Sequence, residues 1–445
     1  MATDRALIEE GLSTYERTLE WLYGLHAAKG MDFKLDRMIA ALRELGDPHR
    51  AFPAIHVAGT NGKGSVAATL HSILTRAGYR VGLYVSPHLI RFTERIRVER
   101  EEVSPGAVVR LAGEARAAAK SAGVEPTFFE LVTLMAFVHF ARSQVDVGVI
   151  EVGLGGRLDA TNVIDPVATV ITTIGRDHTQ FLGDSIATIA AEKAGAIKPA
   201  RPVIVGNVGV EAGRVIEEIA AERAAPVLRM GREYRWFWED GFRFEGLERS
   251  WQRLRLALRG HHQGDNAATA LATLAVLADR LPVSEEAIRS GLASVDWPGR
   301  LQVVTGEPTI ILDGAHNMDA LLALRRELPS LARRRNVHLL FAVMRDKDWQ
   351  PMVDELAPAC TSATVTEVLP PRCLDASVLA ERFHRHCPTS WHPEVLDAWR
   401  EVCRKASRTD VVLVTGSLFL VGAVSEILAD RLAAAKTLAV EGALP

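Results

Sequence analysis

The stretch that decides the fold reads His56-Val57-Ala58-Gly59-Thr60-Asn61-Gly62-Lys63-Gly64-Ser65. An apolar, β-branched segment at 54–58 begins it, and a helical pattern over Ser65–Ala77 continues it. In a strand–turn–helix context, glycines let the backbone approach a phosphate, and backbone N–H groups at the helix N-terminus form an anion cradle. Lys63 can then reach the β- and γ-phosphates of a nucleotide. The sequence therefore predicts a phosphate-binding loop over Gly59–Ser65.

The loop departs from the common pattern G-x-x-x-x-G-K-[ST]. Val57 stands where the first glycine of that pattern would be, and the Ser65 hydroxyl follows the lysine by two residues. The chain also contains no guanine-reading N-K-x-D sequence. These differences argue against a small GTPase or a standard P-loop ATPase.

Outward from the loop, short apolar strands alternate with helices. Strands are predicted at 54–58, 81–85, 145–152, 167–174 and 203–205, and helices at 5–24, 35–46, 65–77, 128–143 and 185–197. This rhythm is typical of an α/β domain with a mainly parallel sheet covered on both faces. Residues 234–259 instead alternate aromatic and arginine side chains, which predicts a small antiparallel sheet at one edge. Helices at 264–280 and 284–292 would close the domain.

A second domain is predicted after a linker at about 294–300. The βα alternation restarts there, with strands at 309–312, 337–343, 363–368 and 411–414. We therefore expect a nucleotide-binding domain with N-terminal helices over 1–296, and a smaller Rossmann-like α/β domain over 297–445. The second domain has no G-x-G-x-x-G after its first strand, which argues against a nicotinamide dehydrogenase.

Composition narrows the possible partners. The net charge of −3 gives no electrostatic reason to expect nucleic acid or an anionic membrane as a partner. No apolar run reaches the ~18 residues of a membrane-spanning helix, and the first residues lack the pattern of a secretory leader. The four cysteines show no short paired spacing, as in proteins of a reducing compartment. We expect a cytoplasmic protein and, without a large exposed apolar stripe, a monomer.

Polar side chains follow three of the predicted strands of the first domain. Ser86 follows the strand at 81–85, Glu151 ends the strand at 145–152, and His178 comes after the strand at 167–174. Each alone is commonly a turn, surface or capping residue. The carboxyl ends of parallel strands gather at one sheet edge, however, and the phosphate loop leaves the sheet there. The combination therefore predicts Mg²⁺ ligands beside the phosphates.

The second domain repeats this arrangement at Asp313-Gly314-Ala315-His316-Asn317, directly after the strand at 309–312. Asn266 begins a predicted helix and Arg300 lies in the linker. A helix cap and a solvated charge are the plain interpretations of these two residues. An arginine near a hinge can also neutralise charge on a phosphoryl group during its transfer.

Several motifs together resemble the dihydrofolate synthase/folylpolyglutamate synthase family of the Mur-ligase superfamily, over residues 14–432. They are H-V-A-G-T-N-G-K-G-S at 56–65, S-P-H-L-I-R-F-T-E-R at 86–95, E-V-G-L-G-G-R-L-D-A-T-N at 151–162, D-H-T at 177–179, E-K-A-G at 192–195, W-P-G-R at 297–300 and D-G-A-H-N at 313–317. The form of the motif at 151–162 favours the bifunctional enzymes over those that only polyglutamylate.

The resemblance implies a complete set of nucleotide and metal ligands. ATP would be held by Gly59, Thr60, Asn61, Gly62, Lys63, Gly64 and Ser65, and the nucleotide site would be completed from across a cleft by Asn266, Arg300, Asp313 and His316. One Mg²⁺ would be bound by Ser86 and Glu151, and a second by Glu151, His178 and a carbamylated Lys193. The catalytic residues would be Lys63, Lys193, Arg300 and His316.

The resemblance also implies a pteroate pocket. Its residues would be Asp32, Phe33, Lys34, Leu35, Thr127, Phe128, Phe129, Glu130, Leu158, Asp159 and Ala160. Lys34 stands where the bifunctional enzymes tend to have a small residue. Phe128 and Phe129 are suited to stacking on a pterin, although packing in the helix core explains one of them equally well.

The activity implied is ATP-dependent addition of L-glutamate to dihydropteroate and to reduced folates through an acyl phosphate. Two alternatives within the class are a polyglutamylation-only folate synthase and another Mur-type amino-acid ligase. The cell-wall ligases carry an extra N-terminal domain, for which the segment before residue 59 leaves no room. A P-loop ATPase switch is the alternative from another class.

Overall fold

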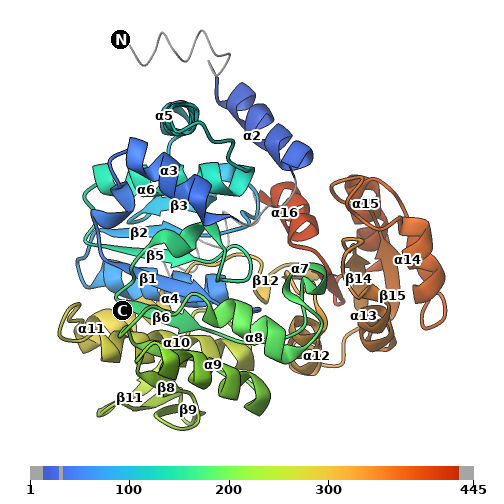
Figure 1. Cartoon of the computed structure of the whole chain (residues 1–445). Coiled ribbons are helices and arrows are strands. Elements are labelled where there is room, and N and C mark those ends of the chain that lie inside the picture. The colour runs from blue at the N-terminus through green and yellow to red at the C-terminus, as the bar shows by residue number, and fades with distance from the viewer. Residues whose placement is uncertain (1–13, 30–33, 430–445) are drawn as a thin grey trace. The chain divides into compact units, whose positions relative to one another are not determined.

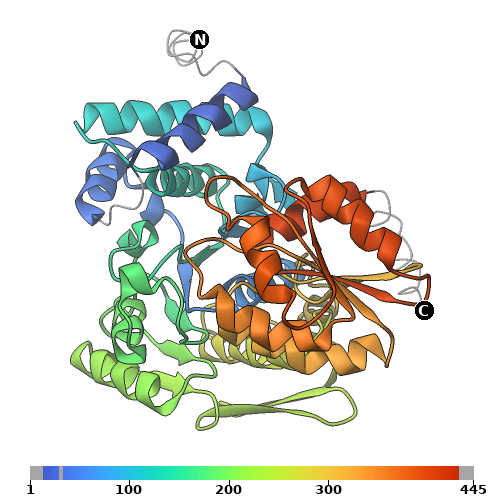
Figure 2. The same ribbon diagram turned by 90° about the vertical axis from the view of Figure 1, so that its right-hand side faces the viewer.

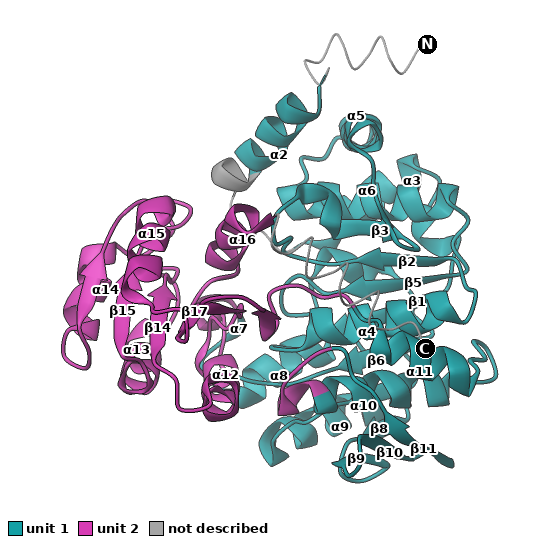
Figure 3. Ribbon diagram, turned by 180° about the vertical axis from the view of Figure 1, so that it is seen from behind, with its two compact units in different colours: residues 1–175, 182–257, 264–295 teal, residues 176–181, 258–263, 296–445 magenta. Residues whose placement is uncertain are grey.

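The computed structural model describes residues 14–29 and 34–429. The chain forms two compact units (Figure 3). Unit 1 comprises residues 1–175, 182–257 and 264–295, and unit 2 comprises residues 176–181, 258–263 and 296–445. Two short segments that lie early in the sequence, 176–181 and 258–263, thus group with the C-terminal part of the chain.

Unit 1 is built around an eight-stranded sheet in the order β4-β3-β2-β5-β1-β6-β7-β8. The strands are β1 (Ala54–Ala58), β2 (Val81–Tyr84), β3 (Ile96–Val98), β4 (Glu101–Glu102), β5 (Val147–Glu151), β6 (Ala168–Ile171), β7 (Val203–Val205) and β8 (Val227–Arg229). Six neighbouring strands run parallel, in the order β2, β5, β1, β6, β7 and β8. The strands β3 and β4 add an antiparallel edge beside β2. The mainly parallel sheet predicted from the apolar strands is therefore confirmed.

Helices cover both faces of this sheet (Figures 1 and 2). They are α2 (Tyr15–Lys29), α3 (Leu35–Glu44), α4 (Lys63–Arg76), α5 (Pro105–Ser121), α6 (Phe128–Arg142), α8 (Ile186–Ala194), α9 (Val210–Glu222), α10 (His261–Val276) and α11 (Glu285–Ala293). The largest core lies where α2, α3, α5 and α6 pack on the sheet, and α6 is buried on nearly every side. A second core joins α8 and α9 to β6 and β7.

The aromatic segment forms the separate antiparallel sheet that its alternation predicted. Its strands are β9 (Tyr234–Trp238), β10 (Phe242–Gly246) and β11 (Arg249–Leu254). Tyr234, Phe242 and Phe244 are buried on one face, because successive side chains of a strand point to opposite sides. The Tyr234 hydroxyl donates to the Val205 carbonyl at 2.8 Å, which fixes the small sheet to β7.

Unit 2 contains a six-stranded sheet in the order β12-β13-β17-β14-β15-β16. Its strands are β12 (Gln302–Val304), β13 (Thr309–Leu312), β14 (Val337–Phe341), β15 (Ser362–Val365), β16 (Thr389–Trp391) and β17 (Val411–Thr415). All pair in parallel except β12, which is antiparallel to β13. The helices are α12 (Met318–Ala332), α13 (Trp349–Leu356), α14 (Ala376–Phe383), α15 (Val395–Lys405) and α16 (Leu418–Ile427). The predicted smaller Rossmann-like α/β fold is confirmed.

None of the helices in the described part of the chain combines the length and apolar content that a membrane span requires.

Candidate functional site

The phosphate loop begins in the four residues, 59–62, that separate β1 from α4. The strand β1 ends at Ala58, and α4 begins at Lys63 with Gly62 as its N-cap in the left-handed region, at φ 85°. At Gly59, with φ 144°, an added Cβ would lie 2.0 Å from Thr172 Oγ1. At Gly62 it would lie 2.3 Å from Asn266 Oδ1. Both glycines are therefore required by close approach as well as by backbone conformation.

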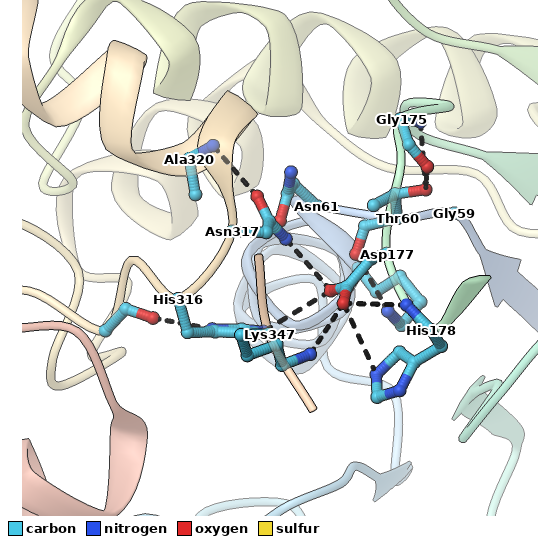
Figure 4. A network of polar contacts seen from close by, with 12 residues as sticks. Gly59, Thr60, Asn61, Gly175, Asp177, His178, His316, Asn317, Ala320 and Lys347 are labelled. Atoms are coloured by element: carbon cyan, nitrogen blue, oxygen red, sulfur yellow. Dashed lines mark hydrogen bonds and ion pairs between the residues drawn. The ribbon is translucent and has the colours of Figure 1, made fainter. Parts of the chain in front are cut away.

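The end of β6 holds the loop in place through hydroxyl and backbone contacts. The Thr60 amide donates to the Thr173 carbonyl at 2.8 Å, and the Asn61 amide donates to Thr173 Oγ1 at 2.9 Å. Thr172 Oγ1 donates to the Asn61 carbonyl at 2.6 Å. Figure 4 shows the Thr60 hydroxyl in contact with the backbone of Gly175. The loop conformation is thus fixed before any ligand binds.

Two lysines point at the same loop. Lys63 Nζ donates to the Thr60 carbonyl at 3.1 Å, so the side chain folds back over its own turn. Lys193, near the end of α8, donates from Nζ to the Gly59 carbonyl at 2.9 Å and is only 4% exposed. Burial of a lysine is costly in its charged form, which marks Lys193 as a residue with a task beyond solubility.

Ser86 and Glu151 meet at the carboxyl ends of adjacent parallel strands. Tyr84 of β2 pairs with Ile150 of β5, and Val57 of β1 pairs with Glu151. The Ser86 amide donates to Glu151 Oε2 at 3.2 Å, and the carboxylate is 4% exposed. A buried carboxylate beside a hydroxyl supplies the hard oxygen ligands that Mg²⁺ prefers. The predicted pair therefore lies together beside the strand that feeds the phosphate loop.

The third predicted metal ligand, His178, belongs to a polar network within unit 2 (Figure 4). Asp177 is its centre. Lys347 Nζ donates to Asp177 Oδ1 at 2.6 Å, and Asn317 Nδ2 donates to Oδ2 at 3.0 Å. His316 Nε2 lies 3.7 Å from Oδ2, and the His178 amide donates to Oδ1 at 2.9 Å. His178 itself adopts a left-handed backbone, at φ 51°.

The charges in this network are coupled. Burial alone would raise the pKa of the Asp177 carboxyl, but Lys347 and the neighbouring imidazoles outweigh burial, so that pKa lies well below its usual range. Burial, reinforced by the Lys347 charge, lowers the pKa of His316 to about 4. At neutral pH the His316 ring is therefore uncharged. Its Nδ1 donates to the Gly314 carbonyl at 2.7 Å, which leaves Nε2 as an acceptor.

The loop after β13 gathers the other predicted residues of unit 2. Asp313 accepts from the Leu301 amide at 2.8 Å and from the Ala315 amide at 3.0 Å, which joins the Arg300 segment to the 313–317 loop. At Gly314 an added Cβ would lie 2.4 Å from Leu418 Cδ2 and 3.0 Å from Arg300 Nη1, so both side chains pack on the bare backbone of this loop. Asn317 caps α12 by accepting from the Ala320 amide at 3.0 Å. In unit 1, Asn266 is buried and lies against Gly62.

The residues predicted for pteroate binding make extensive contacts with other protein groups. Thr127 and Glu130 form a capping box at the start of α6, and Arg37 donates to both Glu130 oxygens at 3.1 and 3.2 Å. Asp159 is buried, and its carboxylate accepts hydrogen bonds from the Leu154 and Thr161 amides. These groups shape the loops of the predicted pocket through internal hydrogen bonds.

The remaining predicted pocket residues differ in exposure. Phe129 packs on the bare backbone of Gly153, where an added Cβ would lie 2.4 Å from its ring. Phe128 is buried, Leu158 is half-buried and Ala160 is buried. Lys34 is exposed and Leu35 is half-buried, whereas Asp32 and Phe33 lie outside the described residues.

Sequence reasoning gave no role to Asp177, Lys347 or Arg37. Asp177 was noticed only as part of the D-H-T motif. Lys347 lies in Asp346-Lys347-Asp348, a polar run that follows β14, and its position after a strand end was the available signal. Arg37 carried no signal, because its partner Glu130 is 93 residues away in the sequence.

Family models match both parts of the chain. The Mur ligase middle domain matches residues 57–274, and the glutamate ligase domain of Mur ligases matches residues 299–418. The dihydrofolate synthase/folylpolyglutamate synthase of Bacillus subtilis is 34% identical over 428 residues, which cover 92% of this chain and 98% of the relative.

The chain belongs to the dihydrofolate synthase/folylpolyglutamate synthase family of Mur ligases.

Solved structures of family members agree with this assignment. Escherichia coli FolC in complex with DHPP and ADP is similar with a TM-score of 0.86 and 37% identity, covering 93% of this chain and 98% of that one. A bifunctional folylpolyglutamate synthase/dihydrofolate synthase with Mn, AMPPNP and L-glutamate bound has a TM-score of 0.85 and 34% identity, covering 94% and 98%. In the present chain, the phosphate loop lies within the residues that match the Mur ligase middle domain, and the 313–317 loop lies within those that match the glutamate ligase domain.

The buried ion pair between Lys347 and Asp177 gives a prediction for the stability of the protein. Lys347→Met removes the partner of Asp177, and both side chains are only 8% exposed. Because an unpaired buried charge is costly, we expect the free energy of unfolding, measured by urea denaturation, to fall by about 3 to 5 kcal/mol. The double variant Lys347→Met/Asp177→Asn should recover part of that loss.

Arg345→Met is the matched control for this experiment. Arg345 pairs with Asp375 at 2.8 Å, but the two side chains are 52% and 53% exposed. Loss of this exposed ion pair should lower the free energy of unfolding by less than about 1 kcal/mol. Equal costs for Lys347→Met and Arg345→Met would show that the buried pair adds nothing to stability.

Proposed function

We propose that the protein joins L-glutamate to dihydropteroate and to reduced folates in an ATP-dependent ligation. The observation that carries the proposal is the phosphate loop of unit 1, with Ser86 and Glu151 at neighbouring strand ends. The family assignment adds the acid and the amino acid, because relatives are named dihydrofolate synthase/folylpolyglutamate synthase.

The proposed chemistry has two steps. A carboxylate is a poor electrophile at neutral pH, so an oxygen of the acid substrate first attacks the γ-phosphorus of ATP, and ADP leaves. The α-amine of L-glutamate then attacks the acyl phosphate carbonyl. The C–N bond forms, the amine loses a proton and phosphate leaves. ATP thus supplies the leaving group that the free acid lacks.

The residues of the phosphate loop have proposed roles in the first step. Backbone amides of the loop and of the start of α4 bind the phosphates, since the first amides of a helix have no partner within it. Lys63 would turn from the Thr60 carbonyl to the transferred phosphoryl group and stabilise its charge. Asn266 and Arg300 are proposed as further ATP ligands, together with Asp313 and His316, of which Arg300 and His316 also act in catalysis.

Two Mg²⁺ ions are proposed, and the donor set fits them. Ser86 and Glu151 would hold the first. Glu151, His178 and Lys193 would hold the second, with Lys193 carrying a carbamate. Bound Mg²⁺ would neutralise phosphate charge and orient the γ-phosphoryl group. Carbamate formation requires the uncharged form of the Lys193 amine.

The acid is proposed to bind at Asp32–Leu35, Thr127–Glu130 and Leu158–Ala160. Among these residues, Phe129 is the proposed stacking partner of the pterin, because it is half-buried. The buried Phe128 ring already stacks on Tyr23 at 5.7 Å and carries the Arg95 guanidinium at 5.3 Å. We propose residues 1–296 as the ATP-binding domain and 297–445 as the ligase domain, and a monomer in the cytoplasm.

The function itself is tested by ADP release. The full chain is mixed with Mg-ATP and L-glutamate, and 7,8-dihydropteroate is added to one sample and a reduced folate to another. We expect turnover in both, with no ADP formed when L-glutamate or the acid is left out. Turnover with the folate alone would indicate a polyglutamylation-only enzyme, and ADP release without any acid would favour an ATPase switch.

The close approach at Gly62 predicts a specific ATP defect. Gly62→Ala places a methyl group against Asn266 Oδ1 at a backbone φ of 85°. Strain of about 1 to 3 kcal/mol at such a position should raise the KM for ATP by about tenfold or more. Gly78→Ala is the matched control, since φ is 92° there and nothing lies within 4 Å. It should change stability but leave the KM for ATP as in the wild type, and equal KM effects would contradict the proposed loop contact.

The carbamate at Lys193 predicts chemical rescue. Lys193→Ala should lower kcat by about 10- to 100-fold, as losses around a metal site commonly do. Added formate or acetate should restore part of the activity, because a free carboxylate can take the place of the carbamate. Lys193→Gln keeps a donor for the Gly59 carbonyl but cannot be carbamylated. Wild-type kcat in Lys193→Gln would show that the lysine is only a structural donor.

A further inference from the structure

Arg95 is a buried cation in the loop that follows β2. It ends a 3₁₀ turn at Phe92–Arg95 and is 7% exposed. Its guanidinium carbon lies 5.3 Å from the centre of the Phe128 ring and 6.0 Å from that of Phe92. Such ring contacts stabilise a cation by only about 0.5 to 2 kcal/mol, less than the cost of removing it from water.

No carboxylate pairs with Arg95 among residues 14–29 and 34–429. Arg91, in the same loop, pairs with Glu102 at 2.9 Å in the usual way. The Arg95 side chain has one hydrogen bond within the described part of the chain, from Nε to His88 Nδ1 at 2.7 Å. Its two terminal nitrogens therefore remain available, and a buried guanidinium with available donors is an anion-binding group.

His88 fixes the direction of that group. The Arg95 Nε–H can only donate, so the imidazole presents its Nδ1 lone pair and carries its proton on Nε2. The ring is held by edge contact with Phe92, whose centre is 6.2 Å away. The loop is rigid, since the Glu94 carboxylate accepts from the amides of Leu89, Ile90 and Arg91. Because His88 holds Nε of Arg95, the orientation of the whole guanidinium, including its two terminal nitrogens, is fixed.

The location of Arg95 identifies the anion. Its guanidinium lies on Phe128, one of the residues proposed above for the acid pocket. An anion bound by Arg95 would therefore lie beside Phe128, at the proposed acid pocket. In the ligation proposed above, the group that must occupy this place is the reacting carboxylate of the acid.

We infer that His88 is a positioning residue that orients the buried Arg95 guanidinium toward the carboxylate of the acid substrate. This inference rests on the proposed function. It assigns recognition of the acid's carboxylate to the hydrogen-bonded pair His88 and Arg95. His88 acts through Arg95 and makes no contact with the reacting atoms.

The test compares dihydropteroate with its neutral carboxamide. Affinities for the full chain with Mg-ADP are measured by calorimetry for the wild type and for His88→Leu, His88→Asn, Arg95→Gln and Arg91→Gln. His88→Leu removes the acceptor at similar volume, whereas asparagine offers an oxygen near the Nδ1 position. Arg91→Gln removes an arginine of the same loop that already has a carboxylate partner, and serves as the charge control.

We expect the wild type to prefer the acid over the carboxamide by about tenfold or more, as for a charge-assisted hydrogen bond. Arg95→Gln and His88→Leu should lose this preference, while His88→Asn and Arg91→Gln keep it. In turnover, His88→Leu should raise the KM for dihydropteroate and leave the KM for ATP within about twofold of the wild type.

Three results would overturn the inference. The first is a wild type that binds the acid and the carboxamide equally, and the second is a His88→Leu variant that keeps the preference for the acid. The third is a His88→Asn variant that loses this preference, has a raised KM for ATP and is less stable to heat. The last result would show that His88 serves folding alone. A wild type that releases no ADP with either acid would instead refute the proposed function, which is a separate outcome.

Discussion

The attachment of the phosphate loop to the end of β6 is the constraint on which the nucleotide site depends. A glycine-rich turn has many conformations in isolation, and ordering it on binding would cost free energy. Here Thr172 and Thr173 bond the backbone of Thr60 and Asn61 from the neighbouring strand. The close contacts at Gly59 and Gly62 leave no room for a side chain at either position. The loop is thus preorganised, and its amides need not be rearranged when a phosphate arrives.

Burial gives the polar residues around this loop their chemical character. Glu151 and Lys193 are nearly inaccessible to water, and Asp177 and Lys347 are paired inside unit 2. In such surroundings a charge is stable only beside a partner, a metal ion or a ligand. Arg95 follows the same rule, since aromatic rings and one imidazole surround it and no described carboxylate does. Asp177 and Lys347 neutralise each other, whereas Glu151, Lys193 and Arg95 are the buried groups proposed to meet a metal ion or a ligand.

The same packing explains the predictions that succeeded and the elements that were missed. Long, strongly apolar segments such as α6 and β5 were predicted within a few residues, because burial on all sides leaves a continuous apolar run. The strands β3, β4 and β12 were missed, because segments of two or three residues are too short to show a periodic pattern. Helices α5 and α9 were missed as well, since alanines and charged residues dilute their apolar stripes.

By itself, the sequence determined the two α/β folds, the phosphate loop, and the strand ends that carry Ser86, Glu151 and Asp313. These features depend on local order along the chain, where a strand, a turn and a helix follow one another within twenty residues. Only the tertiary structure decided that Lys193 reaches the Gly59 carbonyl, that Arg37 joins Glu130 and that Lys347 neutralises Asp177. It also decided that Arg95 bonds His88 and forms no ion pair with a carboxylate of the described residues. Such pairings join residues far apart in the sequence, and a single sequence does not encode which distant side chains packing will bring together.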